Sequence, residues 1–192
     1  MNPWGHFKTI TTHKILVLRH CFRIGIYRQG LMHDMSKYLP VEFLVGAKYY
    51  QGNQSPNNAE RADKGYSAAW LHHKGRNKHH FEYWIDYGLD DPNHEMTGMR
   101  MPRKYVAEML ADRIAASKVY NKHTYTQNDP LNYYLKGKDH YMIHKDTAEE
   151  LEFLLRYLQK YGEDQCFRYV KQVYLKQGIP KKDLQKMKKM SS

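Results

Sequence analysis

Apolar residues recur at spacings of three and four over residues 8–24, and this period predicts a helix. The inward stripe of that helix consists of Ile10, His13, Val17, His20 and Ile24. Positions three and four apart share one helix face, so both histidines lie among apolar side chains. A buried imidazole needs a polar partner, because burying an unpaired polar group costs free energy.

Shorter patterned segments follow this first helix. A second helix is expected to carry residues 31–35, and a third, short helix begins at Pro40. Residues 51–65 are rich in turn-forming residues and predict a polar loop. Residues 66–74 predict another helix.

The clearest helical pattern covers residues 101–120, where Pro102 fits the first turn and strong helix formers fill the rest. One stripe along it, at spacings of four, three, four and three, consists of Tyr105, Met109, Asp112, Ala116 and Val119. Asp112 is therefore expected to be a carboxylate in the middle of an inward face.

The last third of the chain predicts an irregular, tyrosine-rich segment over residues 121–145 and then two helices. The first begins at Asp146 or Thr147 and stops at Gly162, and the second covers residues 163–177. No segment shows a convincing alternation of apolar and polar residues, so the expected fold class is all-α.

The length of 192 residues predicts one domain. We expect a helical core over residues 1–145, a helical pair over 146–178 packed on it, and a basic, frayed tail over 179–192. Asp90 and Asp91 are expected to be surface charges.

The net charge of +11 favours an anionic partner, such as a nucleotide or another phosphorylated metabolite, or a nucleic acid. No stretch approaches the roughly 18 apolar residues needed to span a bilayer. The start lacks the apolar centre of a signal peptide, so a cytoplasmic protein is expected, with no membrane partner. Two cysteines do not make a disulfide framework, which fits a reducing compartment.

Imidazoles and carboxylates that are expected to point inward come from four separate segments. They are His13 or His20, His33 with Asp34, His72 with His73, and Asp112. Neutral imidazole and carboxylate bind Mn, Fe, Co, Ni or Zn, and a metal makes their burial tolerable. We favour His13 over His20, because it leaves room for a helix, a turn and a return before His33. His79 and His80 are an open alternative to His72 and His73.

Three motifs carry a resemblance to a known superfamily: "HDMSK" at residues 33–37, "LHHKGRN" at 71–77 and "LADRIAAS" at 110–117. Over about residues 13–118 the chain resembles the HD-domain superfamily of metal-dependent phosphohydrolases. The whole chain is also similar to an uncharacterised family of small bacterial and phage proteins.

The superfamily resemblance implies a helical bundle that hydrolyses a phosphate ester of a nucleotide or a related metabolite, using one or two divalent transition metal ions. It implies that His13, His33, Asp34 and Asp112 hold one ion, and that His72, His73 or His79 hold a second. Metal-activated water would attack phosphorus, and Lys37, Arg76 and Lys74 would bind the phosphate oxygens.

Two other functions remain open. The same ligands would suit an HD-type di-iron oxygenase. A non-catalytic nucleic-acid-binding or phage-encoded interaction protein is the third hypothesis, with Trp70, Phe81 and Trp84 stacking on bases beside the basic segment 74–78.

Structural roles compete with these chemical ones. Asp112 could form a salt bridge with Arg19, Arg23 or Arg113 instead of binding a metal. Lys37 could be an exposed lysine.

Overall fold

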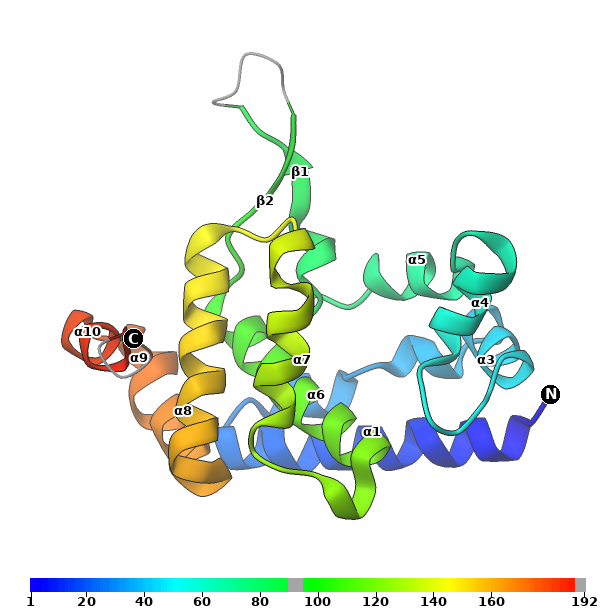
Figure 1. The fold of residues 1–192 in the computed structure, drawn as a ribbon, viewed down its shortest axis with the longest axis horizontal. Helices are drawn as coiled ribbons and strands as arrows, with labels where there is room; N and C mark the ends of the chain where they lie inside the picture. Colours follow the sequence, from blue (N-terminus) through cyan, green and yellow to red (C-terminus); the bar gives the residue numbers. More distant parts are fainter. Residues whose placement is uncertain (90–94, 189–192) are drawn as a thin grey trace.

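A computed structural model describes residues 1–89 and 95–188 of the chain (Figure 1). Asp90, Asp91 and the last four residues of the expected basic tail lie outside the described residues. The described part is built almost entirely of helices, with one pair of very short strands, and the all-α class is confirmed. None of its helices is long and apolar enough to cross a membrane.

Helix α1 (Pro3–Ile24) runs along one side of the molecule (Figure 1). It begins five residues before the apolar pattern, because Asn2 caps it by accepting a hydrogen bond from the Gly5 amide and Pro3 fits its first turn. It ends at Ile24, and the following Gly25 caps it in a left-handed conformation with a φ of 93°. The predicted inward stripe is confirmed, and both of its histidines are buried.

The next elements are α2 (Tyr27–Met32), the 3-10 helix η1 (Met35–Tyr38) and α3 (Pro40–Lys48). The prediction that one helix carries residues 31–35 was wrong. His33 and Asp34 form a sharp turn between α2 and η1, and Asp34 has a left-handed conformation with φ 53° and ψ 24°. Asp adopts that conformation more readily than most residues.

Helix α4 (Pro56–Lys64) lies where a polar loop was expected, and this prediction was wrong. Its sequence is polar, but its Glu60 is completely buried and accepts hydrogen bonds from Ser67 and Lys64. These hydrogen bonds join the buried side of α4 to the residue that caps α5, a contact that the apolar spacing of the segment does not indicate. Helix α5 (Ala68–Lys74) follows as predicted, capped by the Ser67 hydroxyl.

A short hairpin was not predicted from the sequence. The 3-10 helix η2 (Phe81–Trp84) leads into β1 (Ile85–Tyr87), which pairs antiparallel with β2 (Met96–Gly98), Ile85 opposite Gly98. Strands of three residues are too short to show a period of two.

The core is centred on α6 (Arg103–Asn121), which contacts α1, α7 and α8. After the 3-10 turn η3 (Lys122–Thr124), helix α7 (Asp129–Gly137) occupies part of the segment expected to be irregular, so that prediction was wrong. At the start of α7, the Asp129 carboxylate accepts hydrogen bonds from the backbone amide and the hydroxyl of Thr126. These local bonds stabilise the beginning of the helix.

The 3-10 turn η4 (Lys138–His140) leads to α8 (Lys145–Tyr169), which packs beside α7 (Figure 1). Gly162 interrupts α8 with a φ of 75°, at the residue where the sequence predicts a stop. The helical path continues through the π-helical turn η5 (Val170–Tyr174) and α9 (Leu175–Gln177) to Gly178.

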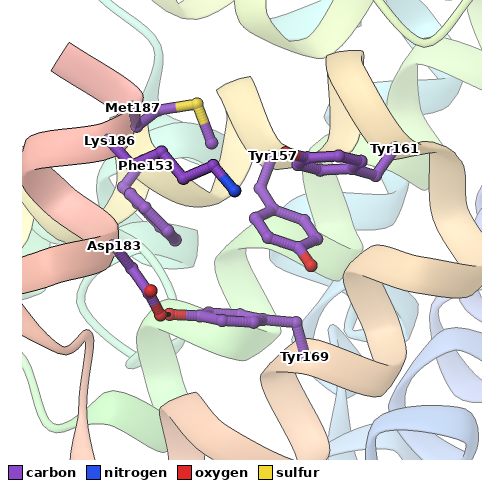
Figure 2. Close-up of a pocket in the computed structure, with 7 residues that line it drawn as sticks. All are labelled: Phe153, Tyr157, Tyr161, Tyr169, Asp183, Lys186 and Met187. Atoms are coloured by element: carbon purple, nitrogen blue, oxygen red, sulfur yellow. Dashed lines mark hydrogen bonds between the residues drawn. The ribbon is translucent and has the colours of Figure 1, made fainter. Parts of the chain in front are cut away.

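Helix α10 (Lys181–Lys188) lies in the segment expected to be a frayed tail, and it packs on α8. Figure 2 shows the aromatic cluster beneath it, formed by Phe153, Tyr157, Tyr161 and Tyr169. The Tyr169 hydroxyl donates to Asp183 at 2.9 Å. The rings of Tyr157 and Tyr169 stack with centroids 4.6 Å apart and line a crevice of about 140 Å³.

Candidate metal centre

Four side chains from three segments converge at the inner face of α1. They are His13 on α1, His33 and Asp34 in the turn after α2, and Asp112 on α6, and we call them the first ligand set. His13 Nε2 lies 2.9 Å from Asp112 Oδ1 and 3.4 Å from His33 Nε2. His33 Nε2 lies 3.3 Å from Asp34 Oδ2 and 3.6 Å from Asp112 Oδ1. Two imidazoles and two carboxylates thus present one donor atom each to a common point.

These spacings fit a metal ion. Four donors placed tetrahedrally at about 2.1 Å from an ion are about 3.4 Å apart. The separations from the two imidazole nitrogens to each other and to the carboxylate oxygens range from 2.9 Å to 3.7 Å, and all four donor atoms lie within 4.8 Å of one another. The set therefore needs only small adjustments to hold an ion.

A second group of donors meets the other oxygen of Asp34. It comprises Asp34, His73, His79 and His80, and we call it the second ligand set. Asp34 Oδ1 lies 3.2 Å from His73 Nε2 and 3.4 Å from His79 Nε2. The Nε2 atoms of His73 and His80 are 2.9 Å apart. Asp34 therefore faces one set with each oxygen, as a carboxylate bridging two ions would.

The state of Asp34 supports a cation between these groups. Its carboxylate is 2% exposed, and neither oxygen accepts a well-aligned hydrogen bond from the described residues. The buried His79 Nε2 likewise makes no hydrogen bond with the described residues. Lys37 Nζ approaches Asp34 Oδ2 to 2.6 Å. Buried polar atoms in folded proteins are almost always partnered. Orphaned donors aimed at shared points are expected where a metal binds.

Two buried glutamates orient the imidazoles from behind. Glu108 Oε1 accepts hydrogen bonds from Nδ1 of His33 at 2.9 Å and of His79 at 3.2 Å. Glu42 accepts from Nδ1 of His73 at 2.8 Å. A carboxylate on Nδ1 leaves Nε2 of the same ring as the donor to a metal.

Neither glutamate was singled out in the sequence. Glu108 precedes Asp112 by four residues and so shares its helix face, which is a signal that could have identified it. Glu42 has no such signal, since only the packing of α3 on α5 brings it to the histidines.

Lys14 holds the turn that carries His33 and Asp34. Its ammonium donates to the backbone carbonyls of Leu31 at 2.9 Å and His33 at 2.8 Å. These carbonyls end α2 and have no helical partner, so the contact satisfies them. Lys14 thus links α1 to the left-handed residue that faces both ligand sets.

The charges around the site keep its carboxylates ionised. Burial alone would raise the pKa of Asp34, but the positive charges of His33, Lys37 and His73 hold it well below its usual range. Burial likewise opposes ionisation of Asp112, and hydrogen bonds from His13 and His33 lower its pKa well below the usual value. Both side chains are therefore ready to bind a cation at neutral pH.

The imidazoles divide into two kinds. Burial lowers the pKa of His13, and burial with the neighbouring His79 and His73 lowers that of His80, so both rings favour the neutral form. Burial also acts on His33 and His73, but the adjacent carboxylates outweigh it and raise the pKa of each. A metal that binds at neutral pH would displace protons from these two rings.

Several residues considered from the sequence lie outside both ligand sets. His20 Nδ1 contacts the Ala111 carbonyl at 3.2 Å, and its ring packs on Phe167. His72 Nδ1 contacts Glu42 at 2.6 Å, so it belongs to the hydrogen bonds behind the second set. Arg76 is exposed, and among the described residues its guanidinium donates to the His72 carbonyl at 3.4 Å.

The positions of Asp112 and Lys37 also decide between a role at the metal centre and the purely structural roles considered from the sequence. Within the described residues, Asp112 forms no salt bridge with an arginine and instead contacts His13 and His33. The Arg113 guanidinium lies over the ring of Tyr134. Lys37 is 30% exposed and its ammonium pairs with the Asp34 carboxylate, so it is a partly exposed cation that already has a partner.

Comparison with known proteins identifies a family. The model of a family of unknown function, DUF5662, matches residues 2–157, which include every residue of both ligand sets and both buried glutamates. No curated protein and no solved structure matches the chain. Since the match covers most of the sequence, the chain belongs to the DUF5662 family.

Proposed function

We propose that this protein is a metal-dependent phosphohydrolase of the HD type that acts on a phosphate ester. The observation that carries the proposal is Asp34, a buried carboxylate without well-aligned hydrogen bonds whose two oxygens face two separate groups of imidazoles. Such a bridging carboxylate is suited to a pair of divalent ions. Enzymes with paired ions commonly catalyse displacement at phosphorus.

The first ligand set would hold one ion and the second ligand set the other. Bound ions would supply Lewis acidity to a phosphoryl oxygen and generate a nucleophile from water near neutral pH. The chain's own contribution is to fix the donors. Glu108 and Glu42 hold the rings of His33, His79 and His73 so that each Nε2 faces Asp34. This preorganisation means that the protein need not rearrange when charge develops on the substrate.

Charge and exposure favour a phosphorylated substrate. Lys37 is the partly exposed cation nearest the shared carboxylate, and in the proposed reaction it binds a non-bridging phosphate oxygen. Arg76 and Lys74 lie at the end of α5 beside His73 and give further positive charge. Trp70 packs against the rings of His73 and His80, which offers an aromatic surface for a nucleotide base. A nucleotide is therefore the proposed substrate class.

The proposal is tested by screening protein loaded with Mn, Fe, Co, Ni or Zn against nucleoside phosphates and simple aryl phosphates. Phosphate release should require added metal and should be lost in Asp34→Asn. The matched control is Asp139→Asn, which removes an exposed carboxylate elsewhere. If no phosphate is released with any metal while the ions bind, the hydrolase proposal is wrong.

A second candidate, an HD-type di-iron oxygenase, is favoured by one observation. The two sets together contain five imidazoles and two carboxylates, a nitrogen-rich supply of donors that suits iron. This candidate predicts that protein reconstituted with iron consumes dioxygen in the presence of an organic substrate. Phosphate release that is equally fast without dioxygen would exclude it as the main activity.

A further inference from the structure

The back of α1 and the segment that follows it expose an unusually large number of apolar side chains. Those that form this outer face, with exposed fractions between 39% and 74%, are Trp4, Phe7, Ile15, Phe22, Tyr27, Leu31, Met32 and Met35. At about half exposure each presents roughly 100 Å², so the face totals roughly 800 Å². Typical monomers expose no apolar patch larger than about 300–600 Å².

The apolar residues of the outer face recur along one side of α1, with Lys8 and Thr11 between Phe7 and Ile15 on that side. Trp4, Ile15 and Phe22 are 11 and seven positions apart, which places them within about 20° of one another around the helix. Trp4 stacks on Phe7 with ring centroids 5.9 Å apart. These residues form a row opposite the inward stripe that carries His13.

Helix α2 extends this row sideways. It packs closely on α1, since a Cβ added at Gly30 would lie 2.8 Å from Cys21 Cβ. The rings of Phe22 and Tyr27 meet edge to face at 5.1 Å, which joins the two helices at the surface. Leu31 lies one turn after Tyr27 on the same side of α2. The face is therefore one surface rather than scattered exposed residues.

We infer that this outer face is the contact surface of a homodimer, in which it packs on the same face of a second copy of the chain. Its area matches the roughly 800 Å² that each partner contributes to a stable interface. A two-fold axis that crosses α1 near its middle pairs the two copies of this helix antiparallel. Trp4 of one copy then faces Phe22 of the other, so the row of apolar residues is complementary to itself. One partner then covers the whole surface.

The charges around the face make the inference specific. All the exposed charged residues in the first 48 positions are basic, among them Lys8, Arg19 and Arg28, while the two acidic residues there, Asp34 and Glu42, are buried. Two copies thus bring like charges together within and beside the contact, and salt should strengthen their association. An acidic partner or an anionic lipid surface would instead be released by salt.

The test is the mass of the full chain in solution, measured by sedimentation equilibrium over a range of protein concentrations. The dissociation constant of the dimer should fall when sodium chloride is raised from about 0.1 M to about 1 M, where the Debye length shrinks from about 10 Å to about 3 Å. A dimer that weakens as salt rises would overturn the inference.

Ile15→Lys and Leu31→Lys test the face directly. Lysine is chosen because a carboxylate could pair with the exposed lysine and arginine side chains within and beside the contact. Each variant should raise the dissociation constant by about 30-fold or more. The control is Met142→Lys, which makes the same charge change at an exposed methionine outside the face. Circular dichroism and metal content verify that each variant folds, because neither position belongs to a ligand set.

Two further outcomes decide against the inference. A chain that stays monomeric at all concentrations, or a dimer that survives both lysine variants, would show that this face does not join two copies. Sedimentation with vesicles of phosphatidylcholine and phosphatidylglycerol tests whether the outer face binds an anionic lipid surface instead. Vesicle binding by a monomeric wild type would reassign the face to anionic lipid.

Discussion

Glu108 joins the two ligand sets, because its Oε1 accepts hydrogen bonds from His33 Nδ1 at 2.9 Å and from His79 Nδ1 at 3.2 Å. His33 belongs to the first set and His79 to the second. One buried carboxylate on α6 therefore fixes the orientation of one ring in each.

This relationship makes Glu108→Gln a sensitive variant. An amide accepts more weakly than a carboxylate, so both rings lose their orientation and part of their basicity. Changes of this kind typically reduce metal affinity about 10- to 100-fold. Isothermal titration of metal into chelator-treated protein measures the effect. Glu95→Gln, at an exposed position, should behave as wild type. Unchanged affinity in Glu108→Gln would mean that Glu108 does not support a metal.

The two sets can be separated by histidine variants. His13→Ala removes a donor that only the first set contains, and His80→Ala removes one that only the second set contains. Each variant should therefore lose one ion and retain the other, as elemental analysis of the purified protein would show. His20→Gln should keep both, because His20 contacts the Ala111 carbonyl and not Asp34 or Asp112. Equal loss of both ions in His13→Ala and His80→Ala would argue against two separable sites.

Much of this architecture follows from periodicity. The stripe on α1 predicts correctly that His13 is buried, because long helices with an apolar face bury it. The stripe predicted on α6 is confirmed only in part: Met109 is buried and the half-buried Asp112 contacts His13, but Tyr105, Ala116 and Val119 are only partly buried. Predictions were wrong for segments that lack a clear apolar period. Helix α4 depends on its buried Glu60, and α7 begins at hydrogen bonds between Asp129 and Thr126, so neither is evident from apolar spacing.

The histidine pairs illustrate a second limit. His72 and His73 are adjacent on α5, where neighbours point about 100° apart, so His73 faces Asp34 while His72 reaches Glu42. His79 and His80 follow the end of α5 in irregular backbone, and both reach the second set. Sequence spacing alone cannot give the path of that connection.

His6 should make folding stability depend on pH below neutrality. Burial, with a smaller effect from Lys37, lowers its pKa to about 4, whereas an unfolded histidine titrates near 6.5. As the pH falls from 6.5 towards 4, the unfolded chain binds a proton that the folded chain excludes, so stability is lost. The contribution at pH 5 is about 2 kcal/mol. Urea unfolding at pH 7 and pH 5 measures the loss, which should be smaller by that amount in His6→Gln. An identical loss in both proteins would contradict this role.

Gly46 is predicted to be intolerant of a side chain. A Cβ at this position of α3 would lie 2.2 Å from His6 Nε2, and both residues are buried. Gly46→Ala should therefore lower the free energy of unfolding by about 1–3 kcal/mol, although alanine favours helices. In thermal unfolding, Gly75→Ala serves as the comparison, because its Cβ would meet nothing closer than 3.4 Å. A Gly46→Ala protein as stable as wild type would show that α3 and α1 are less tightly packed than described.

The most direct test of the metal centre is elemental analysis of Asp34→Asn, purified without chelators or affinity metal, beside wild type and Asp139→Asn. Asparagine tolerates the left-handed conformation of residue 34, so the fold should persist, which circular dichroism verifies. Wild type and Asp139→Asn are predicted to contain two transition metal ions per chain and Asp34→Asn neither, because both sets share this carboxylate. A wild type without metal, or an Asp34→Asn protein that retains its full complement, would contradict the account.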